Sequence, residues 1–111
     1  MRQPRVQWQG NRRRRLFDQV NAAVRIRATT LLPRWCTGGR LQGREFLALN
    51  PHRGDRHLNS FKINIETGRW ADFATGDKGG DFVSFYAFIR RISQGAAVRE
   101  LADDLGVRID G

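Results

Sequence analysis

Apolar residues recur with a helical period near the start of this chain and with a strand period in its middle. Residues 14–27 predict a helix, because their apolar side chains return every three or four positions. The apolar face of this helix consists of Leu16, Phe17, Val20, Val24 and Ile26. Residues 1–13 lack a period and contain Pro4 and Gly10, so we interpret them as a flexible basic arm. A short helical turn is expected to end near Pro33–Cys36.

Three segments in the middle of the chain predict antiparallel strands. The clearest is Ser60–Glu66, in which apolar and polar residues alternate. A tight turn at Thr67–Gly68 predicts that residues 69–74 return as its partner. Residues 44–49 are predicted to form a strand that precedes these two, and the polar residues 50–59 form the loop between it and Ser60–Glu66.

Two helices are predicted after a glycine-rich loop. Asp81 is a good N-cap for a helix rich in aromatic residues, and Ser93 is a good N-cap for the helix that follows. Gly106 ends this last helix. The chain therefore predicts an α+β fold, in which a small three-stranded antiparallel sheet and flanking helices form one domain over residues 14–111.

Positive charge is concentrated in the first half of the sequence. Residues 1–53 hold twelve arginines and two acids, whereas residues 54–111 hold six arginines, two lysines and nine acids. Such asymmetry favours a polyanionic partner, and nucleic acid ranks before a membrane surface. The predicted contact residues are Arg5, Trp8, Arg12, Arg13, Arg14, Arg15, Arg25 and Arg27. A solvated basic tail, or a coding bias toward arginine, is the plainer interpretation of the same pattern.

Aromatic residues on a small sheet can stack on unpaired bases. Trp70 and Phe73 fall on opposite faces of one predicted strand, so at most one of them is free to stack. Trp8 and Trp35 are the other candidates, and core packing is the plainer role for Trp35 and Trp70.

The glycine-rich loop carries three acids, Asp72, Asp77 and Asp81, but it matches neither a phosphate-binding loop nor a calcium loop. Acids in such turns more often accept hydrogen bonds from backbone amides, although a hard metal, with His52 and His57, is an alternative. The single cysteine, Cys36, excludes an intramolecular disulfide and a cysteine-based zinc site. No nucleophile–base pair is visible, so we expect no catalysis by this chain alone, no metal and no cofactor.

Four short segments follow one another in an order typical of a known family. They are Asn50–Arg53 ("NPHR"), Ser60–Asn64 ("SFKIN"), Asp72–Gly76 ("DFATG") and Gly79–Phe85 ("GGDFVSF"). The span Glu45–Leu105 resembles the N-terminal zinc-ribbon domain of bacterial, phage and plasmid DNA primases and primase-helicases. In that family a Cys-Pro-x-His segment precedes a Ser-Phe strand, and a Cys-x-x-Cys hairpin end precedes a Gly-Asp pair that opens an aromatic helix.

The resemblance places the four zinc-ligand positions on Asn50, Arg53, Asp72 and Thr75, none of which is cysteine or histidine. A structural zinc site needs four such ligands, so the resemblance implies a metal-free ribbon. Our hypothesis is that an Arg53–Asp72 ion pair, with hydrogen bonds from Asn50 and Thr75, replaces the metal. The alternative is that the core suffices and these side chains face solvent.

For function, the resemblance implies that the chain recognises single-stranded DNA beside a separate catalytic domain. The expected partners are single-stranded DNA or RNA, together with a primase or helicase catalytic domain or another protein. Two other classes stay open: a stand-alone regulatory protein of a mobile element, and an adaptor that binds a protein or ribonucleoprotein. The sequence has no apolar run long enough to span a membrane and no signal-peptide core, which predicts a cytoplasmic protein without a membrane partner.

Overall fold

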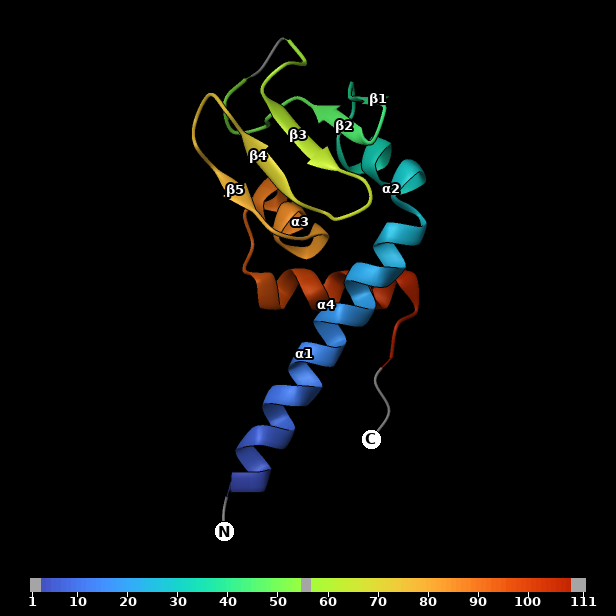
Figure 1. Ribbon diagram of the computed structural model, residues 1–111, viewed down its shortest axis with the longest axis vertical. Helices are drawn as coiled ribbons and strands as arrows, with labels where there is room; N and C mark the ends of the chain where they lie inside the picture. The colour runs from blue at the N-terminus through green and yellow to red at the C-terminus, as the bar shows by residue number, and fades with distance from the viewer. Residues whose placement is uncertain (1–2, 55–56, 109–111) are drawn as a thin grey trace.

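An antiparallel sheet of five strands, in which each strand pairs with the next, lies at one end of the molecule (Figure 1). The computed structural model describes residues 3–54 and 57–108, and it describes side chains from residue 11 onward. The strands in this part of the chain are β1 (Arg40–Gln42), β2 (Glu45–Ala48), β3 (Phe61–Asn64), β4 (Trp70–Asp72) and β5 (Lys78–Gly79). The prediction of an α+β class is confirmed.

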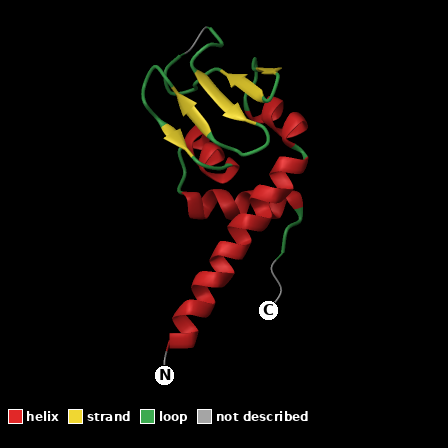
Figure 2. Cartoon of the chain, viewed as in Figure 1, coloured by secondary structure: helices red, strands yellow, loops and turns green. Residues whose placement is uncertain are grey.

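Four helices in the same residues gather on one side of the sheet and beyond its end (Figure 2). They are α1 (Gln3–Ile26), α2 (Ala28–Trp35), α3 (Phe82–Arg90) and α4 (Gln94–Leu105). The molecule measures 55 × 25 × 20 Å, and its length comes from α1, whose N-terminal half projects past α4 (Figure 1). The C-terminal half of α1 is anchored in the core by Val20 and Val24, both of which are fully buried.

The inner face of the sheet packs on α3 through aromatic rings. Phe61 stacks on Phe85 with ring centroids 5.4 Å apart, and Trp70 meets the ring of Phe88 at 4.8 Å. The Trp70 indole nitrogen donates to Ser84 Oγ at 2.9 Å, so its polar atom is satisfied. Each large side chain buried in this way contributes about 1.5–3 kcal/mol to stability, which makes the sheet–α3 contact the centre of the core.

The predicted helix caps are confirmed. Asp81 accepts from the Ser84 amide at 2.8 Å and forms a capping box, and the Ser93 hydroxyl accepts from the Ala96 amide at 3.0 Å. Gly106 ends α4 in the left-handed conformation, with φ 69°. Such caps satisfy backbone groups that a helix end leaves without partners.

Two predictions about the elements are wrong. The sheet has five strands where three were expected, because β1 is three exposed residues and β5 is two residues beside glycines. Pairing with β2 and β4 creates these edge strands, and neither carries an alternating pattern of its own. Residues 3–13, expected as a flexible arm, continue α1 as a helix. Pro4 is compatible with this, because amides in the first turn of a helix need no helical partner.

Candidate nucleic-acid interface

Three of the four predicted zinc-replacing residues meet in a small polar cluster behind the sheet. The carboxylate of Asp72 is fully buried and accepts hydrogen bonds from Asn50 Nδ2 at 2.7 Å and from Arg53 Nε at 3.3 Å. Its other oxygen accepts from the Ala74 amide at 2.8 Å. We call Asn50, Arg53 and Asp72 the Asp72 cluster.

The position of each member follows from its element. Asp72 ends β4 directly opposite Phe61, on the inner face of the sheet. Asn50 lies in the loop after β2, where its side-chain oxygen accepts from the His52 amide at 2.9 Å and fixes the turn. Arg53 follows in that turn and also donates to Ser60 Oγ at 2.7 Å. The cluster therefore links the loop after β2 to the start of β3 and to the end of β4.

Thr75 lies outside the Asp72 cluster. Its exposed hydroxyl donates to the carboxylate of Asp77 at 2.8 Å and accepts from the Asp77 amide at 3.2 Å. Thr75 contributes its backbone amide instead, which donates to the Asp72 carbonyl at 3.3 Å. The Thr75 side chain thus hydrogen-bonds to Asp77, and not to Asp72 as predicted.

Burial of the Asp72 carboxylate opposes its ionisation, but its partners outweigh this effect. The hydrogen bonds from Asn50 and the Ala74 amide, the charge of Arg53 and the Thr75 amide together lower the pKa of Asp72 below its ordinary value. The charged form is therefore the form that the fold stabilises.

Asp72→Asn is expected to remove part of the acid sensitivity of the fold. Since the folded pKa of Asp72 is below the unfolded one, its contribution to stability is present above about pH 4 and is lost as pH falls through the folded pKa. The unfolding free energy of wild type minus that of the variant should thus be constant between pH 7 and 5 and shrink by pH 3. Urea unfolding at these pH values measures it, and an unchanged difference at pH 3 would contradict the assignment.

The other acids of the predicted loop, and His52, have separate partners, and His57 is exposed. Asp77 bonds to Thr75, and Asp81 caps α3 while it accepts from Asn21 Nδ2 of α1 at 3.2 Å. His52 lies against the Phe88 ring and accepts from Arg91 Nε at 2.8 Å. Within residues 3–54 and 57–108, no group of three or more His, Cys, Asp or Glu residues is placed to hold a metal.

Cys36 is buried at the end of α2, and burial raises the pKa of its thiol to about 12. The thiol is therefore protonated at physiological pH, so it is a poor nucleophile and a poor metal ligand.

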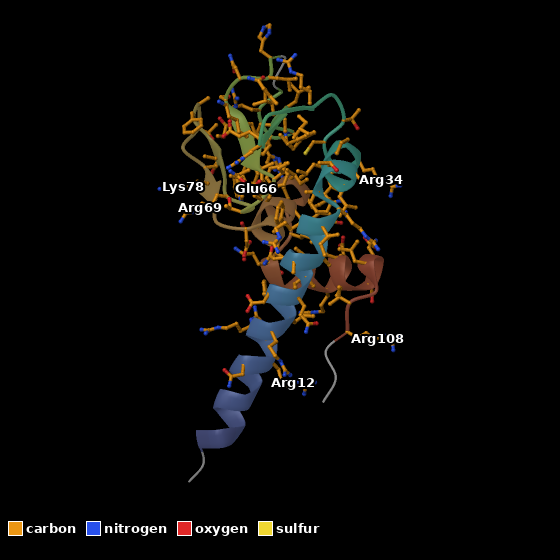
Figure 3. All side chains as sticks on the ribbon, turned by 45° about the vertical axis from the view of Figure 1, so that its right-hand side comes forward. Arg12, Arg34, Glu66, Arg69, Lys78 and Arg108 are labelled. Atoms are coloured by element: carbon orange, nitrogen blue, oxygen red, sulfur yellow. The ribbon has the colours of Figure 1, made fainter. Side chains whose placement is uncertain are left out.

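The predicted arginines separate into two groups along α1. Arg13, Arg14 and Arg15 are exposed on the half of the helix that projects from the body, and Arg12 beside them is half-buried (Figure 3). Arg25, near the opposite end of α1, and Arg27, in the turn that follows it, are exposed about 20 Å away at 1.5 Å per helical residue. The side chains of two further predicted residues, Arg5 and Trp8, lie outside the described part.

One aromatic residue of the sheet faces solvent. The Phe73 side chain is 74% exposed, whereas Trp70 on the same stretch is 6% exposed and packed in the core, which confirms that the two lie on opposite faces. Trp35 is half-buried and contacts Tyr86 edge-on, with ring centroids 4.9 Å apart. Phe73 is thus the aromatic ring that the sheet presents for stacking.

Basic side chains, together with the acid Glu45, share the outer face of the sheet with Phe73. Strand pairing places Arg40, Lys62 and Lys78 in one row across the sheet, on the face that carries Phe73. Lys62 Nζ lies 6.0 Å from the centre of the Phe73 ring. Arg69 lines a shallow pocket of about 380 Å³ with Lys62 and Phe73. Figure 3 shows Arg69 and Lys78 extending from the same side of the molecule.

We call Arg40, Lys62, Arg69, Phe73 and Lys78 the outer sheet face. Sequence reasoning did not select its cations as contact residues, because they are scattered over β1, β3, β5 and the position before β4 rather than gathered in a run. The alternation over residues 60–66 was the available signal, since it already placed Lys62 opposite the buried face.

None of the described helices is both long and apolar enough to cross a membrane. No protein-family model matches the sequence, and no curated protein matches it significantly. The geometry of the Asp72 cluster, the outer sheet face and the arginines of α1 is therefore the evidence on function.

Proposed function

We propose that this chain binds single-stranded nucleic acid through the outer sheet face and the arginines of α1. The observation that carries the proposal is the exposed Phe73 ring among the cations of the outer sheet face. An exposed aromatic ring can stack on an unpaired base, while adjacent lysines and arginines contact the phosphates on either side. A duplex presents no free base face, so single strands are the preferred ligand.

The projecting half of α1 supplies a second contact of different character. Arg13, Arg14 and Arg15 lie on a helix that extends from the body and are suited to phosphate contacts without sequence preference. Their guanidinium groups bind phosphate oxygens in pairs. The resemblance to primase zinc ribbons supports the same class of function, namely recognition of a single-stranded template beside a separate catalytic domain.

In this proposal the Asp72 cluster takes the place that zinc holds in the resembling family. It joins the same loop and strand end through hydrogen bonds and one ion pair. Its task is to hold β3 and β4 in position, so that Phe73 directly after β4 stays on the outer sheet face.

Phe73→Ala is expected to weaken binding to a ~20-mer single strand by about tenfold or more, since one stacked base contributes about 1–3 kcal/mol. The slope of affinity against salt should stay unchanged, because stacking releases few counterions. Fluorescence anisotropy with labelled single-stranded DNA, RNA and duplex DNA measures both quantities.

Ile26→Ala is the matched control, because Ile26 is 80% exposed but lies at the end of α1. It should leave the affinity as it is. Absence of single-strand binding at low salt, or equal loss in the two variants, would refute the proposed function.

A further inference from the structure

A second pocket, of about 560 Å³, lies among the helices and shares no residue with the outer sheet face. Residues from the turn between α1 and α2, from α2, from α3 and from α4 surround it. Its apolar and aromatic lining consists of Leu31, Trp35, Tyr86, Ile89 and Leu105, and its charged lining consists of Arg27, Arg34, Arg90 and Asp104. This volume and this mixture are typical of small-molecule sites.

The three arginines of this helical pocket differ in whether their side chains already have partners within the protein. Arg90 donates to the Tyr86 hydroxyl at 2.7 Å and pairs with Glu100 at 3.3 Å. Arg27 and Arg34 are exposed and make no hydrogen bond or ion pair with another side chain in the described residues. Figure 3 shows Arg34 extending from α2 into solvent. Two guanidinium groups are thus available at the rim of an aromatic pocket.

The charge of the lining is fixed at physiological pH. Burial, together with the hydrogen bond to Glu100, raises the pKa of Tyr86 to about 12, so this hydroxyl stays neutral. Glu100 offsets the charge of Arg90, so the two remaining arginines, Arg27 and Arg34, face the single carboxylate of Asp104. The lining therefore favours an anionic ligand, whose charged group two guanidinium groups can bind and whose body is flat and weakly polar.

We propose that the helical pocket binds a nucleoside phosphate, with its phosphates on Arg27 and Arg34 and its base beside Trp35. The indole ring is half-buried at the pocket wall, where a planar base can contact it. Leu31, Ile89 and Leu105 complete the apolar surface, and Asp104 offers an acceptor to a sugar hydroxyl or a base amino group. This site is separate from the proposed strand-binding surface.

Isothermal titration of the full chain with ATP, AMP and adenosine tests the proposal. Affinity should fall in that order, because each loss of phosphate removes charge from the two free arginines. The variant Arg27→Gln/Arg34→Gln should bind ATP at least about tenfold more weakly, since two charge-assisted contacts are lost. Arg99→Gln on α4 is the matched control: it removes one exposed cation outside the pocket and should bind ATP as wild type does.

In the NMR spectrum, millimolar ATP should shift the Trp35 indole resonance, and this readout needs no variant. No shift and no heat, or equal ATP affinity in the double variant and wild type, would overturn the proposal. Saturating single-stranded DNA distinguishes the source of the nucleotide. If ATP still binds, the site takes free nucleotide; if DNA displaces ATP and the double variant binds DNA more weakly, the site holds a nucleotide of the strand.

Discussion

Asp72→Ala is expected to lower the free energy of unfolding by about 3 kcal/mol, the largest effect of any single substitution proposed for this protein. Asp72 is fully buried and accepts from Asn50, Arg53 and the Ala74 amide, so its removal takes the shared acceptor from three donors. Arg53→Ala should cost less, about 1 kcal/mol, because the Arg53 side chain is 32% exposed and Asp72 keeps its other partners. Urea unfolding monitored by circular dichroism measures both values.

The double variant Arg53→Ala/Asp72→Ala completes the test of the ion pair. Its cost should fall below the sum of the two single costs by about 0.5 kcal/mol or more, because both single variants remove one shared interaction. Thr75→Ala is the control, since within the described residues the Thr75 hydroxyl hydrogen-bonds to Asp77 alone, at the surface, and it should change stability by about 0.5 kcal/mol or less. Additive costs would show that Arg53 and Asp72 do not stabilise the fold as a pair.

Changing Arg12–Arg15 to alanine should produce the largest effect on nucleic-acid binding. If these four arginines each neutralise one phosphate, the logarithmic salt slope on a single strand should become less steep by about 3, at about 0.7 per phosphate. Affinity at low salt should fall in parallel. Helical structure should persist, because alanine is the best helix former and the anchoring residues Val20 and Val24 remain.

The four-arginine variant and Phe73→Ala should therefore change nucleic-acid binding in different ways. The four-arginine variant has a less steep salt slope, whereas Phe73→Ala loses affinity at an unchanged slope. Arg108→Ala controls for the loss of one cation, because Arg108 is exposed, follows α4 and belongs neither to the outer sheet face nor to α1. An unchanged slope in the four-arginine variant would exclude the projecting half of α1 from the interface.

The sequence allowed prediction of those elements whose own residues determine them. The alternation over residues 60–66, the caps at Asp81 and Ser93 and the glycine that ends α4 are local signals, and the structure has each of them. Strands β1 and β5 could not be predicted in this way, because they exist through pairing with neighbours. The first turns of α1 carry no apolar face, so periodicity gave no sign of a helix there.

For the candidate sites, the sequence allowed prediction of which residues carry opposite charges and which strand residues share a face. It did not allow prediction of which distant residues come together in space. Opposite charges at residues 53 and 72 predicted a pair, yet the direction of the Thr75 hydroxyl depends on the local turn toward Asp77. The residues that line the helical pocket are spread between positions 27 and 105, so no sequence motif predicts it. Alternation showed that one of Trp70 and Phe73 faces outward, and only packing against α3 decides which.

The Asp72 cluster also bears on the chemical conditions under which this fold is stable. A ribbon closed by cysteine and zinc depends on metal availability, and its thiolates are targets of oxidants. Asn50, Arg53 and Asp72 contain no sulfur, and the only cysteine of the chain is a buried, protonated thiol. The described contacts that close this loop use neither a metal nor a thiol, so acid, which protonates the Asp72 carboxylate, is the condition expected to weaken them.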